Sequence, residues 1–188
     1  MTGNHATIEP IPTTITRLEM TAPPAHYPPL PVGQNVALLR AHGMPRHFYR
    51  YLMDRVGRPW HWVNALRLDD AKLDELLSQP ERNITTLNLD GAPAGFFEVC
   101  PEGDACQLHF FGLMPHATGR GLGRWFLGAA IRAAWAADPA RVAVETCTLD
   151  HPAALQLYQK LGFEPVGQRR EFITPLGTKD RAEIVMRA

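Results

Sequence analysis

The sequence of 188 residues has no excess of either charge, because 19 lysines and arginines are matched by 19 aspartates and glutamates. Such a chain lacks the basic surface that binds nucleic acid or anionic membranes, so we expect neither partner. Long apolar runs are also missing, and none approaches the roughly 20 residues that cross a bilayer. The opening MTGNHATIEP has no apolar stretch typical of a secretion signal. These absences predict a cytoplasmic protein.

Cysteine is scarce as well. Cys100, Cys106 and Cys147 form no CxxC pair, and their odd number argues against a disulfide framework. This usage favours a reducing compartment, in agreement with a cytoplasmic location. The sequence predicts no metal site.

Proline, by contrast, is concentrated near the start, where eight of the 17 prolines lie in the first 45 residues. Proline fixes φ and removes a hydrogen-bond donor, so the run TAPPAHYPPLPVG is expected to be extended and irregular. We interpret residues 1–34 as a proline-rich N-terminal segment. Within it, residues 15–20 (ITRLEM) can form an edge strand or remain a partly ordered lead-in. Residues 35–188 are expected to form a single domain, since no repeat or second domain is visible.

The first part of this domain predicts helices followed by strands. Residues 35–57 predict two short helices broken at residues 43–45, and residues 68–80 predict a third with Asp69 or Asp70 as its N-cap. Three strand-like runs separated by turn signals come next and predict an antiparallel meander. They are NITTLNL (83–89), AGFFEVC (94–100) and CQLHFFGLM (106–114).

A buried helix is predicted over residues 122–137, because Arg124 and Arg132 are its only charges and lie on one face. RVAVETCTL (141–149) predicts a strand, so the two strands and the helix between them make a βαβ crossover with parallel pairing. The remaining segments predict one helix and two closing strands, over residues 151–162, 171–176 and 182–188. The expected class is therefore α/β, with a mixed, mostly antiparallel central sheet flanked by helices.

The stretch HATGRGLGRW (116–125) lies between the meander and the buried helix. A loop that opens a helix presents unpaired backbone N–H groups at the positive end of the helix dipole, and glycines let an anion approach them. Arg120 and Arg124 would be unfavourable there unless an anion were bound. The stretch predicts a phosphate-binding loop, with a simple turn and solvated arginines as the alternative. Its spacing matches neither a P-loop nor GxGxxG.

Two motifs now carry a resemblance to a known family. LMPHATGRGLGRWFL (113–127) resembles the (Q/R)-x-x-G-x-(G/A) loop of the GNAT superfamily of acyl-CoA-dependent N-acyltransferases. DHPAALQLYQKLGFEPVG (150–167) resembles that family's following helix and strand, N-x-x-A-x-x-x-Y-x-K-x-G-F. The resemblance covers residues 15–188, although before residue 83 it is one of pattern only. It implies a GNAT-like sheet whose βαβ crossover carries the CoA-binding loop, and acetyl-CoA as cosubstrate.

The resemblance also implies which residues bind CoA. Thr118 replaces the family's Gln or Arg, and His151 replaces its Asn, so these two contacts depart from the pattern. The phosphate contacts of the family come mostly from backbone N–H groups, which Thr118 retains. The residues so assigned are Leu113, Met114, Thr118, Gly119, Arg120, Gly121, Gly123, Arg124, His151 and Tyr158.

Catalytic roles follow from the same comparison. Leu113 corresponds to the strand residue whose backbone N–H meets the acyl carbonyl, a task that any side chain permits. Tyr158 corresponds to the tyrosine that protonates the departing thiolate, and its ordinary pKa near 10 keeps it protonated at neutral pH. The alternative for Tyr158 is a core tyrosine on an amphipathic helix.

The resemblance does not point to a single residue as the general base. Gln107 stands where many members have a glutamate, so His109, two residues along on the same face, is the first candidate. His109 can equally be a half-buried sheet residue. Glu98 and Glu145 are the alternatives, and positioning without a dedicated base is a third.

The resemblance also implies that the acceptor meets the region before the third strand, which in this sequence is rich in aromatics. Such a wall suits an apolar or cationic amine, or it simply packs the helices onto the sheet. No acidic stripe that would recruit a basic peptide is present, which favours a small-molecule amine. The alternative functions are a protein N-acetyltransferase and a CoA-binding module without efficient transfer. By analogy with the family, a homodimer is a further expectation. The aromatic residues are Phe48, Tyr49, Trp60 and Trp62.

Overall fold

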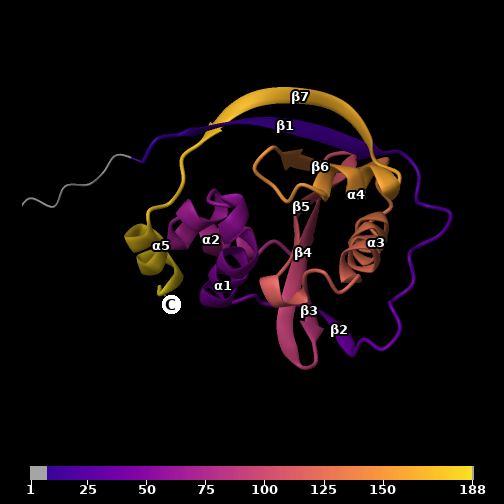
Figure 1. Ribbon diagram of the computed structural model, residues 1–188, viewed down its shortest axis with the longest axis horizontal. Coiled ribbons are helices and arrows are strands. Elements are labelled where there is room, and N and C mark those ends of the chain that lie inside the picture. The colour runs from indigo at the N-terminus through magenta and orange to yellow at the C-terminus, as the bar shows by residue number, and fades with distance from the viewer. Residues whose placement is uncertain (1–7, 188) are drawn as a thin grey trace, which may run out of the picture.

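The computed structural model describes residues 8–187 and contains one seven-stranded sheet in the order β2-β3-β4-β5-β6-β1-β7 (Figure 1). Only β5 and β6 pair in parallel, and every other neighbouring pair is antiparallel. The predicted mixed, mostly antiparallel sheet is therefore confirmed. The strands are β1 (Ile11–Met20), β2 (Val36–Arg40), β3 (Asn83–Leu89), β4 (Ala92–Glu102), β5 (Ala105–Leu113), β6 (Arg141–Cys147) and β7 (Glu164–Ile173).

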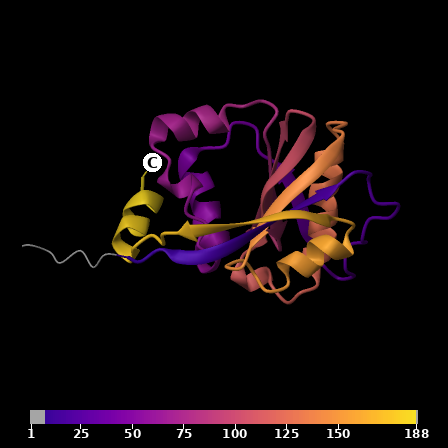
Figure 2. The same ribbon diagram turned by 90° about the horizontal axis from the view of Figure 1, so that it is seen from above.

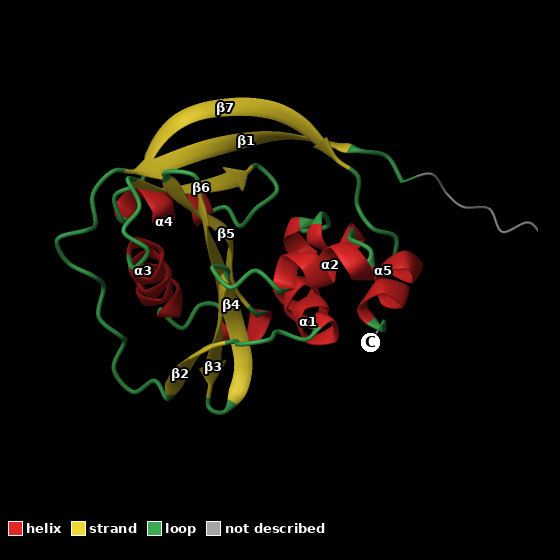
Figure 3. Cartoon of the chain, turned by 180° about the vertical axis from the view of Figure 1, so that it is seen from behind, coloured by secondary structure: helices red, strands yellow, loops and turns green. Residues whose placement is uncertain are grey.

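Helices cover both faces of this sheet (Figure 3). On one face α3 (Leu122–Trp135) and α4 (Ala154–Lys160) bury a core that includes Phe97, Leu108 and Phe126. The other face packs against α1 and its neighbours in a second core. No helix within residues 8–187 is long and apolar enough to cross a membrane. The elements of the second face are α1 (Arg46–Gly57), α2 (Asp70–Leu77), α5 (Thr178–Val185) and the short 3₁₀ turns η1 (Arg58–Trp60) and η2 (Ala65–Arg67).

Strand β1 lies inside the sheet, so the expectation of an edge strand was wrong. It begins at Ile11 and pairs with β7 along most of its length, and from Ile15 onward it also pairs with β6 (Figure 2). Pro12 lies in the part of β1 that does not pair with β6. The N–H that proline lacks therefore breaks no hydrogen bond between these two strands. This part of the proline-rich segment thus belongs to the sheet, while residues 1–7 lie outside the described residues.

Two predicted elements have a different secondary structure. The first helix expected within residues 35–57 is β2, because VALLR pairs with β3 across the sheet edge and this pairing overrides its helical tendency. The strand expected over residues 182–188 is replaced by α5, which ends at Val185, while residue 188 lies outside the described part. Of the strand expected at 171–176, residues 171–173 form the end of the longer β7 and residues 174–176 lie beyond it.

The parallel pairing of β5 and β6 is short. It joins Ala105–Leu108 to Arg141–Val144 and then stops, although both strands continue. Beyond this point the two strands diverge, and α3 crosses between them as the predicted βαβ unit. The divergence leaves the second half of β5 without a neighbour on one side, next to the glycine-rich loop.

A buried ion cluster fastens α5 to α1. Asp54 accepts hydrogen bonds from Arg58 and, at 3.1 Å, from Arg181. Burial alone would raise the pKa of Asp54, but the hydrogen bonds from Arg58 and Arg181 outweigh it and hold that pKa below its ordinary value. Removing Asp54 therefore leaves the guanidinium of Arg181, which is only 8% exposed, buried without this partner.

We expect Asp54→Ala to lower the free energy of unfolding by about 3 kcal/mol, because a charge is left buried without its partner. Urea denaturation measures this change. Asp74→Ala is the matched control. Among residues 8–187 that carboxylate, which is 61% exposed, forms an ion pair only with Arg46, at 3.2 Å, so its loss should cost less than about 1 kcal/mol. Equal effects of the two substitutions would contradict the assignment.

Candidate active site

A cavity of about 480 Å³ opens where β5 and β6 diverge. Its walls come from the end of β5, the glycine-rich loop, the start of α3, the β6–α4 connection and the aromatic turn after α1. It therefore joins segments that are far apart in the sequence. The predicted site residues that line it are His109, Leu113, Thr118, Gly119, Gly121, Gly123, Arg124, His151 and Tyr158.

The glycine-rich loop has the backbone geometry that its glycines allow. Gly119 and Gly121 have φ of 74° and 75°, in the left-handed region that other residues rarely adopt, and Gly121 is the N-cap of α3. A Cβ at Gly119 would meet nothing within 4 Å, so the space in front of the loop is open. The loop thus presents the N–H groups at the start of α3 to the cavity, as a phosphate site requires.

Two residues assigned to CoA binding do not line the cavity. Met114 is 2% exposed and packs into the second core, with its N–H donated to Ala94 O at 2.7 Å. Arg120 instead approaches Asp90, with 3.8 Å between Nη2 and Oδ2. Of the two loop arginines, Arg124 faces the cavity.

Backbone alternation directs the N–H of Leu113 toward the divergence of the strands. Successive N–H groups of a strand point to opposite sides, and that of Met114 points to β4. The N–H of Leu113 therefore points to the side from which β6 has departed, where the pairing ended at Leu108. This orientation is the one that an oxyanion donor needs, and the role itself stays a prediction.

Tyr158 projects from α4 into the same cavity and is 6% exposed. Its ring makes edge contacts with Phe111 and Phe163, at centroid distances of 6.4 and 5.8 Å. Burial, and then the charge of Asp150, raise the pKa of Tyr158 above its ordinary value. The hydroxyl therefore keeps its proton throughout the neutral range.

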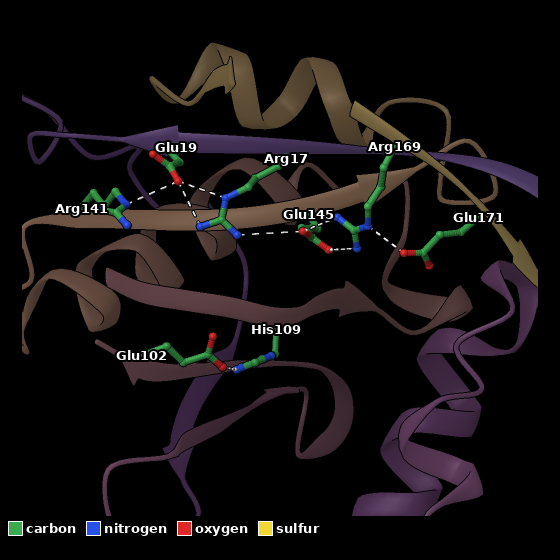
Figure 4. Close-up of polar contacts among 8 residues, drawn as sticks. All are labelled: Arg17, Glu19, Glu102, His109, Arg141, Glu145, Arg169 and Glu171. Atoms are coloured by element: carbon green, nitrogen blue, oxygen red, sulfur yellow. Dashed lines mark hydrogen bonds and ion pairs between the residues drawn. The ribbon is translucent and has the colours of Figure 1, made fainter. Parts of the chain in front are cut away.

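His109 lies at a β-bulge. The register passes from Phe110 opposite Glu98 to Leu108 opposite Val99, so His109 has no partner on β4. Its Nε2 lies 2.9 Å from Glu102 Oε1, a contact drawn in Figure 4, but makes no hydrogen bond with any residue of 8–187. The bulge separates His109 from the regular ladder at the point where the cavity begins.

The protonation of His109 is set mainly by its burial, which lowers its pKa. The nearby carboxylates of Glu98 and Glu102 oppose this shift and Arg82 reinforces it, leaving the pKa below its ordinary value. His109 is therefore neutral at neutral pH, and a neutral imidazole can accept a proton.

The two alternative bases are held by arginines. Glu98 is 1% exposed, accepts a hydrogen bond from Tyr49 at 2.7 Å and another from Arg82, and does not line the cavity. Glu145 does line it, but both oxygens accept hydrogen bonds from Arg169 at 2.6 and 2.7 Å (Figure 4). These bonds, against the opposing effect of burial, lower the pKa of Glu145. Glu98 thus lies outside the cavity, and Glu145 is a poorer proton acceptor than His109.

Sequence reasoning missed Asp150 as a site residue. Its carboxylate accepts hydrogen bonds from Trp62 Nε1 at 3.1 Å and from Thr146 Oγ1 and Cys147 N at 2.9 Å each. It therefore joins the aromatic turn to the β6–α4 connection at the cavity wall. The only sequence signal was its place before His151 at the head of the second motif.

Only part of the expected aromatic wall faces the cavity. Trp60 and Trp62 line it, and Trp62 also contacts Phe110 at a centroid distance of 5.2 Å. Phe48 and Tyr49 are not among its lining residues, because Phe48 stacks on the neighbouring ring of α1 and Tyr49 is buried in the second core. A Cβ at Gly112 would clash with Val56 Cγ1 and lie 3.2 Å from the Trp62 ring, so the glycine leaves room for both side chains.

His151 stands at the mouth of the cavity and is exposed. Its Nδ1 accepts the N–H of Ala153 at 3.1 Å, and its ring makes an edge contact with Trp60 at a centroid distance of 5.2 Å. The first of these contacts helps to order the turn before α4, which begins at Ala154 rather than at residue 151.

Comparison with known proteins identifies the class to which this fold and cavity belong. The sequence model of the acetyltransferase (GNAT) family matches residues 46–163, which is more than half of the chain. The chain therefore belongs to the acetyltransferase (GNAT) family, as the motifs predicted. No curated protein sequence matches it at a significant level.

Solved structures agree with this fold. A GCN5-related N-acetyltransferase from Sphaerobacter thermophilus matches with a TM-score of 0.59 and 17% identity over 89% of this chain and 54% of its own. A GCN5-related N-acetyltransferase from Kribbella flavida matches with a TM-score of 0.54 and 15% identity, over 91% of this chain and 61% of its own. A tandem GNAT protein from the clavulanic acid biosynthesis pathway matches with a TM-score of 0.55 and 17% identity, over 91% of this chain and 56% of its own. The chain thus spans between 54% and 61% of the length of these proteins, and the likeness is one of fold.

Proposed function

We propose that this enzyme transfers an acetyl group from acetyl-CoA to the primary amine of a small molecule, by direct attack of the amine on the thioester. One observation carries the proposal. A single cavity is lined by the glycine-rich loop, the free side of β5 at Leu113, and Tyr158. A CoA thioester needs all three, because phosphate, carbonyl oxygen and sulfur belong to one extended molecule.

The residues present fit acetyl-CoA. The open loop at Gly119 and Gly121 and the guanidinium of Arg124 suit a pyrophosphate, and the gap between β5 and β6 suits an extended chain. The bound donor supplies an activated acetyl group. Leu113 would donate its N–H to the carbonyl oxygen as negative charge develops there. Tyr158 would donate its proton to the departing sulfur.

His109 would take a proton from the attacking amine, directly or through water. His109 lines the cavity and is neutral, whereas Glu98 and Glu145 are held by arginines. Cysteine, metal or redox chemistry is not part of this scheme, which needs only positioning and proton transfer. The role of base falls to His109 by this comparison of the three candidates.

The acceptor is proposed to bind beside Trp60 and Trp62, whose rings form one wall of the cavity. Aromatic faces favour an apolar or cationic amine. The carboxylate of Asp150 already accepts three hydrogen bonds, one of them from Trp62. It therefore serves to orient the Trp62 ring more than to attract a cationic acceptor. A small amine fits these features better than a basic peptide tail, for which an acidic surface would be required.

Release of free thiol from acetyl-CoA tests the proposal. We expect release with a panel of small aromatic and alkyl amines and not with peptides carrying free N-termini or lysines. Release with peptides alone would replace the small-molecule acceptor by a protein. Acetyl-CoA binding without release in either panel would overturn the transferase assignment for this chain.

We expect His109→Ala to lower kcat/KM by roughly tenfold, less than a dedicated base contributes, because positioning supplies the remaining acceleration. In the wild type, activity should fall on acidification at a pH below the ordinary histidine range, since burial lowers the pKa of His109. The variant should lose this acidic limb. His42→Ala, an exposed histidine outside the cavity, is the control and should leave the profile unchanged. An identical acidic limb in His109→Ala would contradict the role.

A further inference from the structure

A second cavity of about 400 Å³ adjoins the first. Gly121 and Arg124 line both cavities, so the two meet at the start of α3. The opposite wall of the second cavity is formed by residues 26–29, which we call the strap. Figures 1 and 3 show the segment between β1 and β2, which contains the strap, running along the outer side of α3.

The strap is attached to α3 by specific contacts. The guanidinium of Arg132 lies 4.4 Å from the centre of the Tyr27 ring, which is a cation–π contact. Pro28 packs on Gly128 so closely that a Cβ there would lie 2.9 Å from the proline Cδ. Proline also limits the conformations that the strap can adopt before any ligand binds. The strap is thus a preformed wall.

The lining of the second cavity combines aromatic and basic groups. Trp125 from α3 and Tyr27 from the strap provide rings, while Arg124 and His26 provide N–H donors. No carboxylate is among the lining residues, and Arg124 makes no ion pair with any carboxylate of residues 8–187. This chemistry suits a planar heterocycle that carries a phosphate.

We propose that the strap and the first turns of α3 form a subsite for the adenosine 3′-phosphate end of CoA, with the adenine against the rings and the 3′-phosphate on His26 and Arg124. This inference rests on the proposed function. With the thioester at Tyr158 and the pyrophosphate at Gly121, the nucleotide end must continue past the loop, away from Tyr158. The second cavity shares Gly121 and Arg124 with the first and is not lined by Tyr158, so it offers a space for that end.

The strap side of the subsite lies outside the matched family segment, whereas Arg124 and Trp125 lie within it. The family match begins at residue 46, and the strap precedes it by some 20 residues in the sequence. The proline-rich segment consequently acquires a function: it connects β1 to β2 and closes the nucleotide end of the donor site. The proposal predicts that affinity for CoA depends on residues outside the family motifs.

Calorimetric titration of the full chain with two donors tests the subsite. Acetyl-CoA carries the nucleotide, whereas acetyl-phosphopantetheine has the same thioester arm without it. We expect His26→Ala and Trp125→Leu each to bind acetyl-CoA roughly tenfold more weakly than the wild type and to bind acetyl-phosphopantetheine equally well. His47→Ala, an exposed histidine that lines neither cavity, should change neither affinity.

The outcomes separate this inference from the proposed function. Wild-type protein that binds neither donor would overturn both. Wild-type binding that His26→Ala and Trp125→Leu leave unchanged, or weaken equally for the two donors, would overturn the subsite alone. Adenosine 3′,5′-bisphosphate should bind the wild type more weakly than acetyl-CoA. Tighter binding of the bisphosphate would assign the cavity to a free nucleotide and overturn the proposal.

A third variant tests the strap itself. Gly128→Ala should preserve α3, because alanine favours a helix more than glycine does, but its Cβ must displace Pro28. We expect thermal stability of the helix to be retained and acetyl-CoA affinity to fall roughly fivefold, with acetyl-phosphopantetheine unaffected. Undiminished acetyl-CoA affinity in Gly128→Ala would contradict the role of the strap as a wall.

Discussion

Gly121→Glu is expected to abolish acetyl-CoA binding, with a loss of affinity of at least about a hundredfold. Gly121 lies at the N-cap of α3 and lines both cavities, so a carboxylate there would stand beside the pyrophosphate. Two like charges about 4 Å apart at the protein surface repel by several kcal/mol, which corresponds to this loss. Calorimetric titration with acetyl-CoA measures it directly.

The substitution also strains the backbone, because Gly121 has a φ of 75°. Gly43→Glu is the matched control: its φ is 73°, a Cβ there meets nothing within 4 Å, and it lines neither cavity. This control should bind acetyl-CoA normally at a similar cost in stability. Retained binding in Gly121→Glu would mean that the glycine-rich loop serves something other than CoA, and the proposed function would fall with it.

Tyr158→Phe should lower kcat by a factor on the order of 10² while leaving acetyl-CoA affinity unchanged. Phenylalanine keeps the edge contacts with Phe111 and Phe163, so the shape of the cavity is preserved and only the hydroxyl is lost. Burial raises the pKa of Tyr158, so in the wild type the proton is present throughout the neutral range. Release of free thiol under saturating acetyl-CoA measures the change.

Tyr51→Phe provides the control, because this tyrosine of α1 is 37% exposed and lines neither cavity. Its turnover should equal that of the wild type. If Tyr158→Phe turned over as fast as the wild type, Tyr158 would have no role in the reaction and would be a core tyrosine, the alternative given above. A fall in acetyl-CoA affinity without a fall in kcat would assign it to binding.

The features that could be predicted from the sequence are those that depend on neighbours along the chain. Gly119 and Gly121 predicted an open loop before a helix, and in the structure both have positive φ and Gly121 is the N-cap of α3. Strands β3, β4 and β5 were predicted as a meander because their turns are encoded locally, by pairs such as Asp90-Gly91. The crossover through α3 followed from the apolar pattern of one helix between two strands.

The features that could not be predicted depend on segments far apart in the sequence. Asp150 joined the candidate site through Trp62, 88 residues away, and no local pattern encodes that hydrogen bond. The bulge at His109 depends on how β5 aligns with β4, and a one-residue shift in register leaves the strand sequence unchanged. VALLR became β2 because β3 offered an unpaired edge, which outweighs the weak helical preference of five residues.

The sequence by itself thus determined the family, the crossover and the glycine-rich loop, because each rests on residues close together in the chain. The tertiary structure decided the rest. It placed β1 between β6 and β7, left Met114 and Arg120 outside the cavity, and set the strap against α3 beside Arg124. Long-range pairing and packing act only once the chain has folded, so their results are read from the structure alone.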